Sequence, residues 1–104
     1  MDLSKMMKQA QKMQKDMATT QAALASRPVE ATAGGGKVTV TATAGGDITG
    51  IRIDPSVVDA SDVEMLEDLI LTGVRAALTE GRKVAEAEMK KVTAGMGLPP
   101  GMGF

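Results

Sequence analysis

Hydrophobic and polar residues alternate strictly from Lys37 to Thr43, a pattern that predicts a β-strand with one buried face. Val38, Val40 and Ala42 fall on one face of this strand, and lysine and threonine side chains fall on the other. Valine and threonine also suit the pleated surface of a sheet. This strand belongs to the stretch 34–54, around which we expect the rest of the chain to be organised.

Glycine-rich turns flank this strand on both sides. The segment 45–47 (Gly-Gly-Asp) tolerates the positive φ of a tight hairpin, so residues 48–53 are expected to return as a second strand. Pro55 then ends the pairing because proline has no amide proton. Upstream, residues 28–33 are expected to form a third strand, with the glycines 34–36 as its turn. Together these segments predict a three-stranded antiparallel meander.

Residues 2–25 are predicted to form a long helix with two contrasting faces. Apolar side chains follow a heptad-like spacing at Leu3, Met6, Ala10, Met13, Met17 and Leu24, which we call the apolar seam. Lysines repeat with the same spacing on the opposite face, and we call them the lysine stripe: Lys5, Lys8, Lys12 and Lys15. At ~1.5 Å per residue this helix spans about 33 Å, so part of it should project or contact a partner chain.

A second long helix is expected from Ser61 to about Thr93. Ser61 and Glu64 have the spacing of a capping box at its start. Its expected buried face consists of Val63, Leu66, Ile70, Val74, Ala77 and Leu78, widened by Leu69 and Leu71. An apolar sector this wide predicts contact on two sides, one within the chain and one between chains.

Two features of this helix raise questions of assembly and shape. We expect the contact between chains to form a homodimer through Leu66, Leu69, Ile70 and Val74.

Gly73 and Gly81 each cost roughly 1 kcal/mol in a helix interior, so they indicate either a close approach or a bend. The sequence does not decide between these two.

The chain length of 104 residues accommodates one domain, which we place at 1–93. Residues 94–104 are rich in glycine, proline and methionine and are expected to be a flexible tail. The net charge of −1 conceals an uneven distribution. No lysine or arginine occurs in residues 54–68, where the acids are Asp54, Asp59, Asp62, Glu64, Glu67 and Asp68.

The composition argues against an enzyme and against a metal or cofactor site. The chain has no His, Cys or Tyr, so the usual nucleophiles and zinc ligands are missing. The acids of 54–68 do not match a calcium-binding loop, and the glycines 34–36 lack the ending of a phosphate-binding loop. No signal peptide, membrane span or small-molecule site is indicated.

The lysine stripe is the remaining candidate site, and it has three interpretations. It is either a solvated helix face, a membrane-surface helix or a phosphate-binding surface. No glutamate alternates with the lysines four residues apart, as it often does on an ordinary surface helix. The apolar face of this helix carries no Trp or Phe to anchor it in a membrane, which makes that alternative weak.

Four stretches of the sequence resemble the YbaB/EbfC family of bacterial nucleoid-associated proteins. They are MKQAQKMQKDM at 7–17, AGGGKVTVTATAGGDITGIRIDPSVVD at 33–59, DVEMLEDLI at 62–70 and GMGLPPG at 95–101. The resemblance implies an α+β fold of the order α-β-β-β-α and a tweezer-like homodimer with protruding helices. It also implies a cytoplasmic protein that binds double-stranded DNA on the nucleoid.

The resemblance extends the candidate DNA-binding residues beyond the lysine stripe. It implies that the basic end of the last helix also lies near DNA, at Arg82, Lys83, Lys90 and Lys91. Lysines contacting phosphates would give affinity without strong sequence readout. The alternative function is a scaffold that recruits proteins of DNA repair or recombination through the acidic start of the second helix or through the tail.

Overall fold

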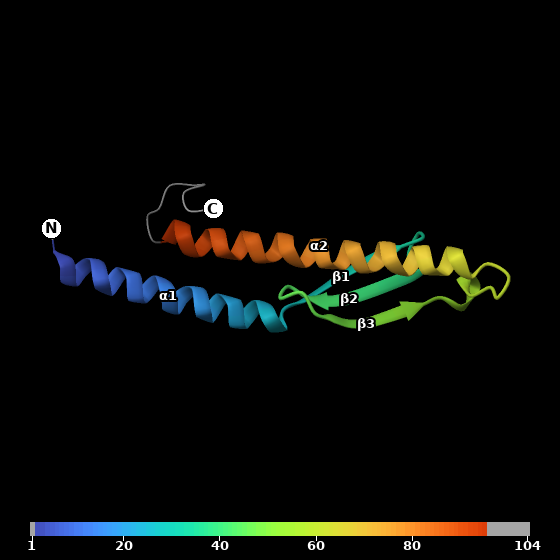
Figure 1. The fold of residues 1–104 in the computed structure, drawn as a ribbon, viewed down its shortest axis with the longest axis horizontal. Helices are drawn as coiled ribbons and strands as arrows, with labels where there is room; N and C mark the ends of the chain where they lie inside the picture. The colour runs from blue at the N-terminus through green and yellow to red at the C-terminus, as the bar shows by residue number, and fades with distance from the viewer. Residues whose placement is uncertain (1, 96–104) are drawn as a thin grey trace.

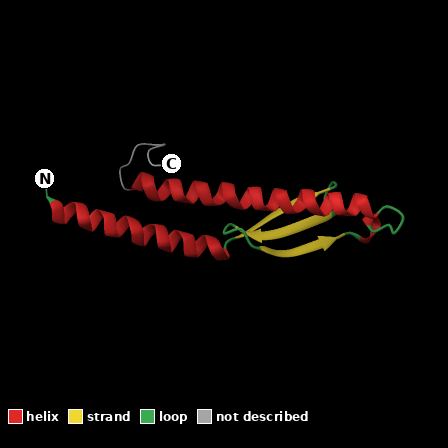
Figure 2. Cartoon of the chain, in the orientation of Figure 1, coloured by secondary structure: helices red, strands yellow, loops and turns green. Residues whose placement is uncertain are grey.

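The computed structural model describes residues 2–95, and the fold that it shows is α-β-β-β-α (Figure 1, Figure 2). The elements in chain order are α1 (Leu3–Ser26), β1 (Pro28–Ala33), β2 (Val38–Thr43), β3 (Ile48–Ile53), the short 3-10 helix η1 (Pro55–Val57) and α2 (Val63–Gly95). The predicted fold class and the three-stranded meander are therefore confirmed. The expected tail at 94–104 lies outside the described residues except for Ala94 and Gly95, which continue α2.

The sheet is antiparallel, with β2 in the middle. Val38, Val40 and Ala42 are fully buried on one face of β2, whereas the threonines between them are half-buried on the other. The register places Val29, Ala31 and Ala33 of β1 and Ile48, Ile51 and Ile53 of β3 beside these three residues, on the same face. The alternation in the sequence therefore predicted which side of the sheet forms the core.

The turns have the backbone conformation that their glycines suggested. Gly34, Gly35 and Gly36 in the first turn and Gly46 in the second all have positive φ. Both hairpins are therefore tight, and they hold the three strands in one layer.

α2 crosses the core face of the sheet and packs on β1 and β2 (Figure 1). Gly73 and Gly81 are buried where it does so. A Cβ at position 81 would lie 3.0 Å from the carbonyl oxygen of Thr43, so this glycine lets the helix approach the sheet backbone. Of the two alternatives, close approach is the observed one, although the partner is the sheet and not another helix.

The predicted capping box at the start of α2 is wrong. The Asp62 carboxylate accepts the hydrogen bond from the Met65 backbone amide, at 3.3 Å, and so caps the helix. The Ser61 hydroxyl instead donates to Asp59 Oδ1 at 2.7 Å. Ser61 belongs to the preceding turn because its backbone amide and its hydroxyl both donate to Asp59 Oδ1, so the hydroxyl does not cap the helix. Val63, expected on the buried face, is 53% exposed at the first turn of α2.

α1 extends away from the sheet beside the C-terminal half of α2 (Figure 1). Leu24 is its one buried residue among those described, and it lies near the junction with β1. Leu3 and Met6 at the other end of the apolar seam are 69% and 51% exposed. The helix thus projects from the protomer, as its length predicted.

Candidate nucleic-acid interface

The lysine stripe lies on the projecting helix α1, and all four of its side chains are exposed. Asp2 caps the helix by accepting a hydrogen bond from the Lys5 backbone amide, at 3.4 Å. Among the described residues, none of the four lysine side chains forms an ion pair. Their ammonium groups are therefore available to a negatively charged partner.

The candidate residues of α2 occupy more varied positions. All four are exposed: Arg82, Lys83, Lys90 and Lys91. Lys91 donates to Glu88 Oε1 at 3.1 Å, and Arg82 donates to the hydroxyl of Thr79 at 3.3 Å. Lys91 is therefore partly neutralised by a glutamate on its own helix.

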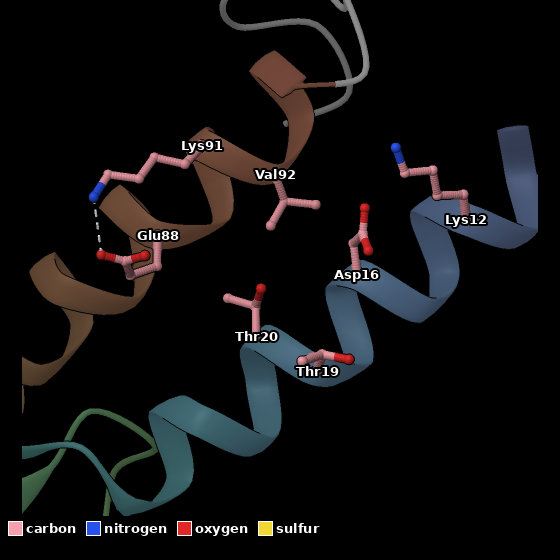
Figure 3. Close-up of a pocket in the computed structure, with 7 residues that line it drawn as sticks. All are labelled: Lys12, Asp16, Thr19, Thr20, Glu88, Lys91 and Val92. Atoms are coloured by element: carbon pink, nitrogen blue, oxygen red, sulfur yellow. Dashed lines mark hydrogen bonds and ion pairs between the residues drawn. The ribbon is translucent and has the colours of Figure 1, made fainter.

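Lys12 of the stripe and Lys91 both line a groove between α1 and α2, although the Lys91 side chain points away from Lys12 toward Glu88 (Figure 3). Its volume is about 360 Å³, and Asp16 and Glu88 also line it. Lys5 and Lys8 lie farther along α1, beyond the residues that line the groove. The structure therefore gathers cations from both helices at one end of the molecule, with two carboxylates between the helices.

The lysine stripe and the acidic stretch 54–68 lie toward opposite ends of the long axis of the molecule (Figure 1). The protomer measures 71 × 22 × 16 Å, with the N-terminus of α1 at one end and η1 and the start of α2 at the other (Figure 1). The acidic stretch 54–68 therefore lies at the end opposite the lysine stripe. An anionic polymer would be attracted to the α1 end and repelled by the other.

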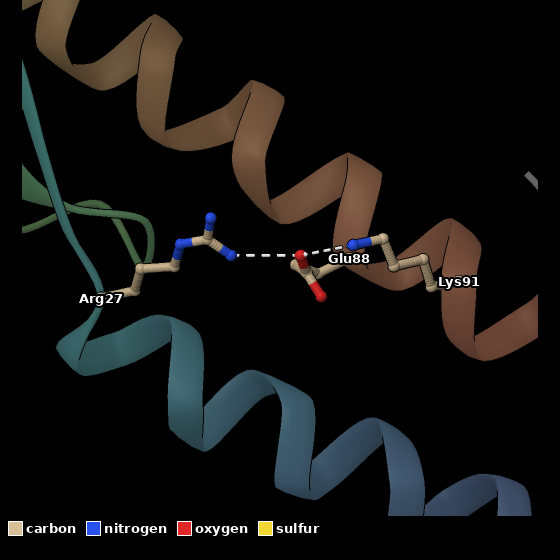
Figure 4. Close-up of polar contacts among 3 residues, drawn as sticks. All are labelled: Arg27, Glu88 and Lys91. Atoms are coloured by element: carbon tan, nitrogen blue, oxygen red, sulfur yellow. Dashed lines mark hydrogen bonds and ion pairs between the residues drawn. The ribbon is translucent and has the colours of Figure 1, made fainter.

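Sequence reasoning missed an ion-pair cluster that joins the two helices (Figure 4). Arg27 Nη1 and Lys91 Nζ each lie 3.1 Å from Glu88 Oε1. Hydrogen bonds from Lys91 and Arg27 hold the pKa of the Glu88 carboxyl below its ordinary value. The spacing of Glu88 and Lys91 on one helix was visible in the sequence. The Arg27 contact spans 61 residues, and no local pattern signals it.

The expected interface residues Leu66, Leu69, Ile70 and Val74 are all half-buried within the protomer. Leu69 and Val74 pack against the monomer core, so they have partners in their own chain. Leu71, which was expected only to widen the buried face, is 47% exposed. Ile48 and Ile51 of β3 are 39% and 44% exposed, because α2 covers β1 and β2 more fully than β3.

The profile of the YbaB/EbfC DNA-binding family matches residues 1–96 of the chain. The chain belongs to this family. A nucleoid-associated protein of Akkermansia muciniphila is 51% identical over 104 residues, which is 100% of both chains. A nucleoid-associated protein of Acetivibrio thermocellus is 50% identical over 101 residues, covering 97% of this chain and 89% of that protein.

A solved structure shows the same fold as this YbaB/EbfC chain. The uncharacterized protein HP0035 from Helicobacter pylori has a TM-score of 0.66 and 22% sequence identity, covering 92% of this chain and 97% of that one. The YbaB/EbfC family is described as a DNA-binding family. Within residues 2–95, no group of His, Cys, Asp and Glu is arranged to hold a metal, and no helix could cross a membrane.

Proposed function

We propose that this protein binds double-stranded DNA on the bacterial nucleoid, in the cytoplasm, as a tweezer-like homodimer. Family membership supports DNA as the partner, and the names of the relatives support the nucleoid. The observation that carries the mechanism is the lysine stripe, whose exposed cations lie on a projecting helix far from the acids of 54–68. Lysine ammonium groups bind phosphate oxygens mainly by charge, so DNA is bound with little sequence readout.

The homodimer is supported by the apolar surface that one protomer leaves uncovered. Ile48, Ile51 and Leu71 are all more than a third exposed, and the apolar seam of α1 is open toward its N-terminus. A second copy that covers the β3 and α2 residues removes this surface from water. Two copies also present two lysine stripes, which doubles the number of phosphate contacts. In this proposal DNA lies against the projecting helices, and the protein organises the nucleoid and influences gene expression without catalysing a reaction.

A salt titration of DNA binding tests the phosphate mechanism. With about 4 to 8 phosphate contacts in a dimer, the logarithm of the binding constant should fall against the logarithm of salt concentration with a slope of roughly −4 to −7. Replacing the whole stripe (Lys5→Gln, Lys8→Gln, Lys12→Gln and Lys15→Gln) should flatten the slope and weaken binding to unrelated duplexes alike. Glutamine keeps good helix propensity, so the circular dichroism should not change.

A matched control neutralises charges at the other end of the molecule. Asp62→Asn with Glu67→Gln should leave both the affinity and the salt slope close to those of the wild type, because these residues lie far from the stripe. If the stripe variant keeps wild-type affinity while the acidic variant loses it, DNA does not bind along α1.

The second candidate function, a protein-recruiting scaffold, is favoured by one observation at the acidic end. Val58, Val63 and Met65 are 58%, 53% and 40% exposed among the carboxylates of that region. A basic partner with an apolar centre would fit this surface. This function predicts that the stripe variant retains its biological role while substitutions at Val58 and Met65 abolish it.

A further inference from the structure

Glu88 receives cations from two different parts of the chain on one carboxylate oxygen (Figure 4). Lys91 is one helical turn away on α2 itself, so the Lys91–Glu88 bond does not fix the position of α2 relative to any other element. Arg27 comes from the junction between α1 and β1, so its bond ties the position of α2 to that junction. The Arg27–Glu88 contact is thus a cross-link between the sheet-packed helix and the base of the projecting one.

The backbone of Arg27 is fixed on both sides. Its amide donates to the Leu24 carbonyl at 3.2 Å and caps α1, and its carbonyl accepts from the Ala44 amide at 2.9 Å, just after β2. A Cβ at Gly45 would lie 3.0 Å from Ala25 Cα, so the last turn of α1 sits directly against this hairpin. These contacts hold the base of α1 against the sheet, and Arg27 lies at that base.

α1 contacts α2, but its own packing is mostly partial. Leu24 is the buried residue of this helix, and Met13 and Met17 are only half-buried. An exposed ion pair usually contributes little to folding stability. A contribution of that size is nevertheless enough to favour one direction of α1 over others of similar energy. Small energy differences shift the populations of such conformations.

We infer that Glu88 is a positioning residue whose bond to Arg27 sets the direction of α1, and with it the lysine stripe, relative to α2. The consequence for DNA rests on the proposed function. A glutamate beside the cationic end of the molecule opposes a polyanion by its charge. Glu88 favours binding in a different way, because it holds the lysine stripe and Lys91 at a fixed spacing. The lysines then contact phosphates without the entropic cost of being ordered on binding.

The positioning is measurable without DNA, because the chain has no cysteine and accepts site-directed spin labels. Labels at Gln9→Cys on α1 and Ala87→Cys on α2, both exposed positions, report the spacing of the helices. Dilution with excess unlabelled chain restricts the signal to distances within one protomer. We expect one narrow distance distribution for the wild type and a broad one for Glu88→Gln and for Glu88→Asp, which keeps the charge but shortens the reach.

Glu86→Gln is the matched control, since Glu86 is exposed two residues away and has no ion pair among the described residues. It removes the same charge as Glu88→Gln and should leave the distribution narrow. DNA affinity should be about two- to fivefold lower for Glu88→Gln than for Glu86→Gln, a ratio typical of an exposed ion pair. An equally narrow distribution in Glu88→Gln, Glu88→Asp and Glu86→Gln overturns the inference.

The two measurements also separate this inference from the proposed function. If Glu88→Gln broadens the distribution while both glutamine variants bind DNA equally well, Glu88 positions α1 but DNA does not read the stripe. That result supports the positioning role and contradicts binding along α1.

Discussion

Gly73 of α2 lies directly over Val40 of β2, and no side-chain atom fits between them. A Cβ at position 73 would lie 2.8 Å from Val40 Cγ2, closer than such atoms approach. Val40 is fully buried and β-branched, so it has no alternative rotamer that relieves the contact easily. The approach of α2 to the sheet therefore depends on glycine at this position.

Replacing Gly73 by alanine should destabilise the protein even though alanine is the better helix former. Overpacking costs about 1–3 kcal/mol, and the gain in helix propensity returns roughly 1 kcal/mol. We expect a net loss of about 1 kcal/mol in urea unfolding at fixed protein concentration. In a Val40→Ala background the same change should be neutral or stabilising, and stabilisation by Gly73→Ala alone would contradict the close approach.

The two residues before α2 should differ in their effect on stability. Asp62→Ala removes the N-cap and should cost about 1 kcal/mol in the free energy of unfolding. Ser61→Ala removes only an exposed bond to Asp59 and should change stability by less than about 0.5 kcal/mol. A larger effect of Ser61→Ala in thermal or urea unfolding would restore the capping box that the structure contradicts.

Acid should destabilise the fold through the carboxylates of two connector turns. Hydrogen bonds from the Ser61 hydroxyl and amide lower the pKa of Asp59, and bonds from the Ser56 amide and hydroxyl, with Lys37 nearby, lower that of Asp54. A carboxyl whose pKa is lower in the folded state stabilises the fold at pH values above its unfolded-state pKa, which is near 3.8. This stabilisation is lost as the pH falls through the folded-state pKa. Thermal unfolding should therefore shift downward as the pH falls below about 5.

Asparagine substitutions identify which carboxylates cause this dependence. Asp59→Asn with Asp54→Asn should flatten the decline between about pH 5 and pH 3. The matched control is Asp47→Asn in the β2–β3 turn. Asp47 bonds to Thr43 through its own backbone amide and carbonyl, and these bonds do not depend on its carboxylate. A decline that is equally steep in the double variant would assign acid sensitivity to other groups.

Substitutions on α2 should separate dimer dissociation from unfolding. Leu71→Asp places a charge on an exposed apolar position, so we expect a folded monomer by sedimentation and circular dichroism. Leu69→Asp should unfold the chain, because Leu69 packs against the core and lies beside Gly34. Thr72→Asp, on the opposite flank of the helix, should remain a dimer. A wild-type chain that sediments as a monomer would refute the homodimer.

Local patterns predicted the strands and turns because their causes are local. The alternation at Val38, Val40 and Ala42 has the two-residue period of a strand, and glycine at position 46 supplies the positive φ that its turn needs. The start of α2 was misplaced because Ser61 and Asp62 are both good capping residues, and only the hydrogen bonds that Ser61 donates to Asp59 decide between them.

Contacts between distant segments were not predictable in the same way. The apolar seam of α1 indicated a helix with a binding face, but the seam alone does not say which surface covers it. The lysine stripe was predicted to be exposed, and it is. Arg27 and Glu88 are unremarkable in the sequence, and their bond depends on how α1 leaves the sheet.

The separation of charge along the protomer also explains how a chain with a net charge of −1 can meet a polyanion. Mobile ions screen electrostatic interactions over about 8 Å at physiological ionic strength. That distance is far shorter than the 71 Å length of the molecule. A DNA duplex near the tip of α1 would therefore be attracted by the lysines there. Its repulsion by the carboxylates at the far end would be screened by salt. The net charge of the chain therefore does not give the sign of the surface that DNA meets in the proposed binding mode.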